Sequence, residues 1–357
     1  MSMQTSTAEL IKRLSVAVGV TGYAGPHNIH EVVSAEMTPL VNRVSHDRLA
    51  SVTGLKAGEQ TPAAGQPRRK IMLAAHLDEI GGMVTRLDQG FLRFTQIGGL
   101  DDRVLMGQEV TVHGKRDLLG LIGSIPPHFQ RNGKSNKVNL YEMLIDVGLP
   151  AEEVEQLVQV GDLISFRQVP LDLKNGLVAG KSLDNRVSVA AILVCLQELQ
   201  KMRHQWDVYA VATADEEWSY YLGAATQAYA IRPDVAIVID VTFADVDELE
   251  VKLDQGPVIS LGPSNHPFIR KRLIDICEAM EMSYQSEMMP SGAGSDAYAI
   301  EVSREGVPTI LISIPSRNMH TAVEIVQPRD VDRVGRLLAQ FIASLDEAFV
   351  TELIPKI

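Results

Sequence analysis

Short apolar runs that end in acidic or imidazole side chains dominate the hydrophobic pattern of this chain. Four of these runs are followed within six residues by a histidine or a carboxylate: Ile71–Ala75, Val208–Thr213, Val235–Ile239 and Ile310–Ile314. Unbroken apolar runs of this length are typical of strands that are buried on both faces of a sheet. Because ligands of open α/β sheets bind outside the carboxyl ends of the strands, we expect the polar side chains to meet at one site.

Seven side chains form this candidate site. Six follow the apolar runs and the seventh precedes a helix-like pattern; they are His76, Asp78, Glu216, Glu217, Asp240, His320 and Asp184. Imidazole and carboxylate ligands together suit zinc, manganese or cobalt. Taken alone, each residue has an ordinary explanation: Asp184 is a typical helix N-cap, and His76 could be a satisfied buried histidine. These explanations would have to hold at five separate places along one sheet edge, so we favour a shared metal site.

A two-metal hydrolase makes specific demands on such a set. Metals about 3.5–4 Å apart need a carboxylate that bridges them, terminal ligands on each, and a free carboxylate that takes the proton of water. Neighbouring side chains diverge, so Glu216 and Glu217 can supply one base and one ligand. Asp78 lies two residues beyond His76. Because side chains two apart in a strand point to the same side, Asp78 can orient the imidazole of His76.

The remaining pattern predicts an α/β fold with a mostly parallel sheet, because strand-like and helix-like segments alternate. A hairpin is expected within Val41–Thr53. The expected helices are Thr7–Val18, Val187–Met202, Phe268–Met280 and Arg329–Ala348.

A different texture runs from Gly81 to about Pro170, where short alternating runs are separated by glycine-containing turns. It predicts a small β-rich, barrel-like insert with one helix near Asn139–Val147. The length of 357 residues also favours two domains. We expect residues 1–81 and 174–357 to form an α/β/α domain, and residues 82–173 to form the insert.

Composition narrows the partners and the compartment. The apolar content of 45% is that of a soluble globular protein, and the net charge of −12 argues against a nucleic-acid surface. Cys195 and Cys277 are too few for a disulfide framework, which favours a reducing compartment. Neither a signal peptide near Met1–Lys12 nor an apolar run of membrane-spanning length is visible. We therefore predict a cytoplasmic location, with no nucleic-acid or membrane partner.

Seven segments, in the order of a known family, give the chain a specific resemblance. They are His76–Gly81, Pro126–His128, Leu183–Arg186, Glu216-Glu217, Ile239–Thr242, Ser295–Ala297 and Ile314–His320. With them the chain resembles the dinuclear-metal aminopeptidases typified by tetrahedral aminopeptidases and bacterial glutamyl aminopeptidases. These proteins are also known as cellulase-M-like or FrvX-like peptidases.

The resemblance implies two divalent cations per chain, with zinc expected and cobalt or manganese as alternatives. It implies that Asp184 bridges the two cations. His76 and Asp240 would complete one coordination site, and Glu217 and His320 the other.

The resemblance also implies roles beyond the ligands. Glu216 would be the general base, and Asp78 the acid that orients the imidazole. The β-rich insert would mediate dimerisation, so a homo-oligomer is expected, with dimers that assemble into a dodecamer in the family.

The predicted function is that of a metallo-aminopeptidase that removes N-terminal residues from short peptides with metal-activated water. A deacetylase or a carboxypeptidase could use the same dinuclear centre. A cellulase-like glycosidase is the weaker alternative, because that chemistry needs two carboxylates but no histidine ligands.

Three departures from the family pattern spare every proposed ligand. Asp215 replaces a glutamine, Asn318 replaces a tyrosine, and five residues, Trp218–Leu222, stand where the family has four. The aromatic side chains of Trp218–Leu222 either pack under the following helix or line the pocket for the first side chain of the substrate. In the second case, apolar first residues would be preferred.

Overall fold

One large mixed sheet forms the centre of the protein. The computed structural model describes residues 6–25, 28–59, 67–124, 139–218, 220–247, 249–291 and 294–353. In order across the sheet, the strands are β1 (Arg43–His46), β2 (Val52–Lys56), β12 (Asp207–Thr213), β3 (Lys70–His76), β13 (Val235–Phe243), β16 (Thr309–Arg317), β17 (Glu324–Val326), β11 (Val178–Gly180) and β10 (Leu171–Asp172). β14 (Val258–Leu261) pairs with β16 and with β15 (Gln285–Met288).

The four central strands β12, β3, β13 and β16 are parallel, whereas the flanking pairs β2–β12 and β16–β17 are antiparallel. The described helices are α1 (Thr7–Val16), α2 (Ile29–Met37), α3 (Ala151–Leu157), α4 (Leu183–Glu198), α5 (Leu222–Ile231), α6 (Pro267–Ala279), α7 (Ala297–Glu301), α8 (Pro328–Ala343) and α9 (Glu347–Leu353), with 3-10 turns at Thr38–Leu40, Asp102–Val104, Leu140–Glu142 and Lys174–Gly176. The mixed sheet with parallel central strands, together with these helices, confirms the predicted α/β fold class.

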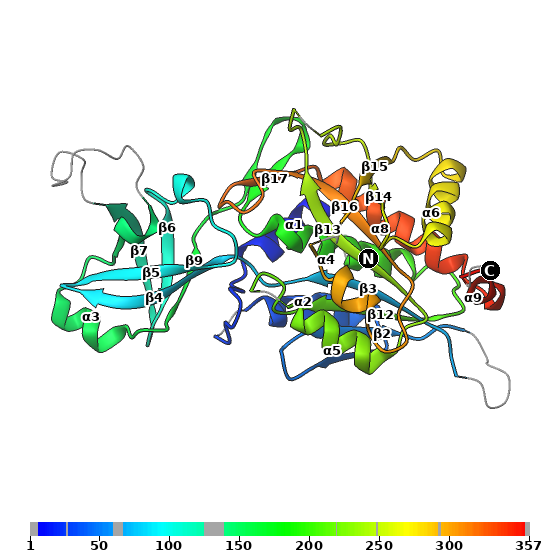
Figure 1. Cartoon of the computed structure of the whole chain (residues 1–357). Coiled ribbons are helices and arrows are strands. Elements are labelled where there is room, and N and C mark those ends of the chain that lie inside the picture. The colour runs from blue at the N-terminus through cyan, green and yellow to red at the C-terminus, as the bar shows by residue number, and fades with distance from the viewer. Residues whose placement is uncertain are drawn as a thin grey trace.

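Helices cover both faces of the sheet (Figure 1), because alternate side chains of the buried strands point to opposite faces and are apolar on each. In β3, Ile71 and Leu73 face the core beneath α4 and α8, while Met72 and Ala74 face the core beneath α5 and α7. Both faces are therefore apolar, which is why the central strands read as unbroken apolar runs.

A closed antiparallel barrel stands beside this body (Figure 1). Its strands, in order around the barrel, are β4 (Gly81–Asp88), β5 (Phe91–Ile97), β8 (Met143–Asp146), β7 (Asp117–Ser124), β6 (Glu109–His113) and β9 (Leu163–Phe166). It has an apolar core of its own, which includes Leu92, Val110 and Ile145. The barrel-like insert is thus confirmed as an element of the fold, and its boundaries at residues 82 and 173 stay a prediction.

The helix that we expected near Asn139–Val147 is wrong. Met143–Asp146 forms strand β8, which pairs with β5 and β7. Met143 and Ile145 point into the barrel core while Leu144 and Asp146 point outward, so the apolar spacing there has the period of a strand. The helix of this region is α3, which begins after Pro150 with glutamates in its first turn.

The predicted hairpin is present, because β1 and β2 pair antiparallel with Ser45 opposite Thr53. The long helix expected over Arg329–Ala348 is instead two helices, α8 and α9. Asp346 caps the second by accepting a hydrogen bond from the Phe349 backbone N–H at 3.0 Å. Within the described part of the chain, no helix has both the length and the apolar character needed to cross a membrane.

Candidate metal centre

The site lies where the central strands separate. Pairing between β3 and β13 ends at Ala74 and Val238, but β3 stays paired with β12 as far as His76. The chain passes from β3 to β12 through α4 on one face, and from β12 to β13 through α5 on the other. A reversal of this kind at the carboxyl edge of a sheet is where open α/β folds bind ligands.

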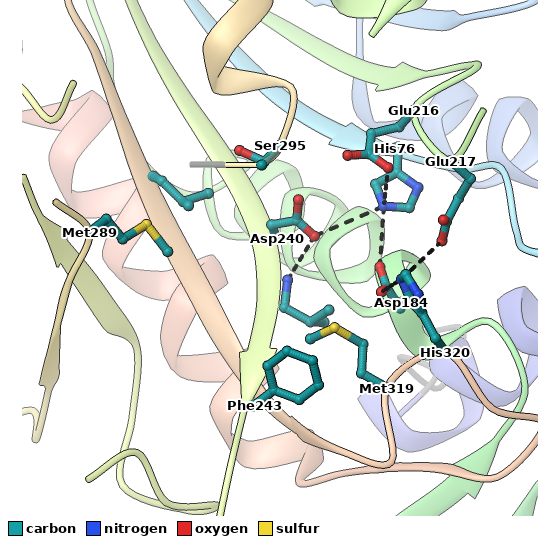
Figure 2. Close-up of a pocket in the computed structure, with 13 residues that line it drawn as sticks. His76, Asp184, Glu216, Glu217, Asp240, Phe243, Met289, Ser295, Met319 and His320 are labelled. Carbon is teal, nitrogen blue, oxygen red and sulfur yellow. Dashed lines mark hydrogen bonds and ion pairs between the residues drawn. The ribbon is translucent and has the colours of Figure 1, made fainter. Parts of the chain in front are cut away.

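Six of the seven predicted residues line one cavity of about 250 Å³ at this edge (Figure 2). They are His76, Asp184, Glu216, Glu217, Asp240 and His320. His76 is the last residue of β3, and Asp240 lies within β13. Asp184 lies in the first turn of α4, and the other three follow β12 or β16.

The carboxylate of Asp184 lies between the two imidazoles. Its Oδ1 is 3.2 Å from Nε2 of His76, and its Oδ2 is 3.3 Å from Nε2 of His320. Asp240 lies on the His76 side, with an oxygen 3.9 Å from His76 Nε2. Glu217 lies on the other side, 3.7 Å from His320 Nε2. One oxygen of Asp184 thus faces each half of the cluster, which is the arrangement that a bridging ligand needs.

Two groups of three side chains could each hold a cation. Asp184 and Glu217 with His76 form one group, and Glu216 and Asp240 with His76 form the other. In each group, one ligand atom per residue lies within 4.8 Å of the others. Glu216 is close enough to act as a ligand or as a base, since its Oε2 is 3.7 Å from His76 Nε2.

The acids of the cluster repel one another in a buried setting. Burial raises the pKa of Glu216 to about 10, and the charges of Asp240 and Asp296 add to the rise. Burial raises the pKa of Asp240 to about 7. Burial and the charge of Asp184 raise the pKa of Glu217 well above its ordinary value. Positive charge from a cation would relieve this repulsion and hold the acids ionised.

The histidines respond to the same surplus of negative charge. Burial would lower the pKa of His76, but Glu216, Asp184 and Asp78 outweigh it and raise that pKa well above its ordinary value. Hydrogen bonds from His320 and His76 overcome the effect of burial on Asp184 and hold its pKa below its ordinary range. Two imidazoles with four buried or half-buried carboxylates are a donor set that fits two divalent cations.

Asp78 lies behind the cavity and holds three neighbours. It is 2% exposed, and its carboxylate accepts the backbone N–H groups of Glu216 and Glu217 at 3.2 Å each. The hydroxyl of Thr21 donates to it at 2.7 Å. Nδ1 of His76 is 3.6 Å from the Asp78 carboxylate and 3.2 Å from its carbonyl oxygen. Asp78 therefore fixes the backbone of the glutamate pair as well as facing the imidazole.

A buried ion cluster joins the two segments that carry His76 and Asp184. Glu79 is 1% exposed and lies 2.5 Å from Lys181 Nζ and 3.3 Å from Arg186 Nη2. Arg186 is fully buried and also donates to the carbonyl of Leu14 at 2.7 Å. Leaving any of these charges unpaired would be costly, so the cluster locks the end of β3 against the start of α4.

Glu324 is a candidate positioning residue that sequence reasoning missed. It is 1% exposed, and its carboxylate accepts the backbone N–H of Asp184 at 2.8 Å and that of His320 at 2.9 Å. One side chain thus fixes the backbone of two candidate ligands on separate segments. Its sole sequence signal is an acid four residues after His320, which does not stand out from the other acids of the chain.

The barrel also reaches this site, through the loop after β5. A β-carbon on Gly98 would lie 3.0 Å from Oε2 of Glu217, and one on Gly99 would lie 2.8 Å from Nδ1 of His320. Gly98 also has a φ of +75°, which side-chain-bearing residues rarely adopt. Both glycines are needed because the loop packs directly against two candidate ligands.

Two further segments that carry the family resemblance are Ser295–Ala297 and Pro126–His128. Asp296 is 1% exposed and accepts a hydrogen bond from the hydroxyl of Thr213, on the strand next to His76. Burial raises the pKa of Asp296 to about 6. Pro126–His128 lies outside the described residues.

The aromatic residues of Trp218–Leu222 do not line the cavity among the described residues. Tyr221 packs toward Tyr298, with ring centroids 6.4 Å apart, while Trp218 is 56% and Tyr220 81% exposed. The packing alternative therefore holds for Tyr221, and the pocket wall must come from other residues.

Comparisons with known proteins agree with the fold and identify the family of the chain. A family model described as M42 glutamyl aminopeptidase matches residues 60–337. A lysyl aminopeptidase of Pyrococcus furiosus is 32% identical over 349 residues, covering 94% of this chain and 97% of that protein. A solved TET aminopeptidase from a Thaumarchaeota archaeon of marine sediment aligns with a TM-score of 0.89 at 30% identity, covering 98% and 99% of the two chains. The Pyrococcus horikoshii TET1 peptidase, which assembles into a tetrahedron or a large octahedral shell, aligns at 0.81 and 28% identity, covering 95% and 100%.

We predict that Glu324→Gln weakens cation binding without unfolding the protein. A glutamine keeps the shape but turns an N–H group toward one of the two backbone donors, so Asp184 or His320 loses its support. Loss of such a supporting hydrogen bond typically costs about 10–100-fold in metal affinity. Calorimetric titration of metal-free protein with Zn²⁺ measures the change. Glu109→Gln, which alters an exposed carboxylate of the barrel, is the matched control. Equal affinities in the two variants would contradict this role.

Proposed function

Because the chain belongs to the M42 glutamyl aminopeptidase family, and is therefore a metal-dependent aminopeptidase, we propose a specific division of labour in its cavity. Asp184 would bridge two divalent cations, His76 and Asp240 would complete one site, and Glu217 and His320 would complete the other. The observation that carries this proposal is the position of the Asp184 carboxylate, with one oxygen toward each histidine.

The chain's own residues would act around the two cations. When bound, the cations supply Lewis acidity, which polarises the scissile carbonyl and lowers the pKa of water. Glu216 accepts the proton of the attacking water and passes it to the leaving amine. Glu216 must be ionised for that step, and nearby cationic charge opposes the burial that raises its pKa. Asp78 keeps Glu216 in position through the backbone N–H of that residue.

The substrate is a short peptide with a free amino group. That group can coordinate a cation or meet the carboxylates of the cluster, which favours cleavage at the chain end over internal cleavage. Family membership favours this aminopeptidase over a deacetylase, a carboxypeptidase or a glycosidase with the same residues. We propose zinc as the native metal, with cobalt or manganese as alternatives, and a cytoplasmic location.

We further propose that the barrel, within residues 82–173, joins two chains into a dimer. On strands β5 and β7 its outer face carries three exposed apolar side chains, Leu119, Leu121 and Phe91, which are 54%, 53% and 40% exposed. Leu119 and Leu121 both point outward from β7 and belong to one patch, and Phe91 lies on the far side of the exposed Asp146 from Leu121. Apolar patches of this kind commonly mark interaction surfaces. Assembly of the Pyrococcus horikoshii relative into closed shells supports a second copy as the partner.

Protein purified without chelator should contain more than one divalent cation per chain. Since His320 would serve one coordination site alone, His320→Ala should lose about one equivalent. Elemental analysis provides the count. His46→Ala, which removes an exposed imidazole from β1, should keep the full complement. A stoichiometry that never exceeds one would exclude the dinuclear proposal.

Glu216→Gln should reduce turnover by about 10²–10⁴-fold and leave the metal content unchanged, because the amide cannot accept the proton. Glu217→Gln should lose a cation instead. The measurement is kcat on an aminoacyl anilide, alongside elemental analysis of each variant. Near-full activity of Glu216→Gln, together with both cations in Glu217→Gln, would refute the two roles.

Placing acids on the barrel patch should produce a smaller species in solution. The double variant Leu119→Glu, Leu121→Glu brings buried charge into the proposed interface, which is costly without a partner. Size-exclusion chromatography with light scattering gives the mass. Leu261→Glu, at a 46% exposed site on β14, is the matched control. An unchanged mass for the double variant would reject this interface.

A further inference from the structure

The cavity has a second wall that is apolar. Beside the metal-candidate cluster, the described lining consists of Gly294, Ser295 and five apolar side chains, Val241, Phe243, Met289, Leu311 and Met319. Figure 2 shows Met289 across Asp240 from Glu216 and Glu217, with Phe243 and Met319 below Asp240 in this view. This wall takes no part in the proposed catalysis, so its chemistry is free to select the substrate.

The wall begins where the cluster ends. Val241 directly follows Asp240, and Met319 directly precedes His320. The first side chain of a peptide branches from the α-carbon, which is bonded to both the free amino group and the scissile carbonyl. If the cluster holds those two groups, the side chain must start right beside the cluster. We propose that Phe243, Met289 and Met319 receive this side chain and make the enzyme select apolar first residues. This inference rests on the proposed aminopeptidase function.

An acidic first residue would meet no cationic partner in the described lining. Its carboxylate would lie near Glu216 and Asp240 and against apolar carbon, where a charge without a partner is costly. Arg317, two residues before Met319, is not a lining residue, and its Nε donates to Asp245 at 2.6 Å. The arginine that could serve a glutamyl substrate is therefore engaged elsewhere.

A lysyl first residue would also be bound poorly by this cavity. The acids that line the cavity are the proposed ligands and base, so their charge is committed to cations and to the proton of water. The rest of the wall would strip water from the ammonium group without replacing its hydrogen bonds. The chain thus differs in its expected preference from the lysyl aminopeptidase that it resembles.

Two methionines set the breadth of the selection. Met289 and Met319 are partly buried and pack against opposite apolar cores of the α/β body, so each has a fixed stem and an adaptable thioether end. Unbranched methionine side chains fill irregular gaps and fit ligands of different shape. Phe243 is 49% exposed and can stack on an aromatic substrate. We therefore expect leucyl, methionyl and phenylalanyl substrates to share the site.

The first experiment is a panel of leucyl, methionyl, phenylalanyl, alanyl, lysyl and glutamyl anilides on Zn²⁺-loaded wild-type protein. The kcat/KM on leucyl should exceed that on alanyl by at least about tenfold, the scale of one methylene group in an apolar pocket. Glutamyl and lysyl substrates should fall below alanyl. Best turnover on a glutamyl or lysyl substrate would overturn the inference.

The second experiment places a cation on the wall. Met289→Lys should raise the glutamyl-to-leucyl ratio of kcat/KM by at least about tenfold, because the new ammonium pairs with the substrate carboxylate and disfavours apolar side chains. Met288→Lys is the matched control, because this neighbour is 80% exposed and does not line the cavity. An equal change, or no change, in both variants would overturn the assignment of Met289.

A binding measurement separates this inference from the proposed function. Calorimetric titration of the loaded protein with free leucine and free glutamate reports the preference of the wall without any hydrolysis. Tighter binding of leucine in wild type, reversed in Met289→Lys, supports the wall even if no anilide is cleaved, in which case only the proposed function fails. Tighter binding of glutamate in wild type overturns the wall even if anilides are cleaved.

Discussion

The carboxylate of Asp184, held between two imidazoles, is the interaction on which the rest of the site depends. Its two oxygens lie 3.2 and 3.3 Å from His76 and His320. Those histidines come from opposite sides of the opening between β3 and β13, so the carboxylate spans the site and sets the separation of its halves. Glu217 and Asp240 then find their places on either side of it. A cluster so rich in buried acid is stable only with matching positive charge, which cations provide.

The polar groups behind the cavity hold backbone rather than ligand side chains. Glu324 fixes the N–H groups of Asp184 and His320, and Asp78 fixes those of Glu216 and Glu217. A carboxylate that accepts backbone hydrogen bonds leaves the neighbouring side chains free to face the cavity. This arrangement explains how three loop positions and one in the first turn of α4 can be placed with the accuracy that metal coordination requires.

Most of the candidate ligands could be predicted from sequence because they close or closely follow an apolar run, as His76 does at the end of β3, whereas Asp184 stands at the start of α4. Glu324 could not, because its partners are backbone groups that only the folded chain brings within reach. The pocket wall was missed for the same reason, since Met289 joins it from a loop after β15. Two departures from the family pattern have a local explanation: Asp215 and Asn318 have φ values of 62° and 57°, a region that Asp and Asn tolerate better than most residues.

The barrel is joined to the metal-candidate cluster at three points, so its position affects the geometry of the cluster. Its strands lie between Glu79 and Lys181, which form a buried ion pair at 2.5 Å beneath the site. Its β5 loop places Gly99 where a β-carbon would meet His320. A displacement of the barrel would therefore disturb two candidate ligands, Glu217 and His320, directly, and the buried ion pair beneath the site through both ends of the insert. Any contact that holds the barrel still, including a second copy on its outer face, would at the same time hold the geometry of His320 and Asp184.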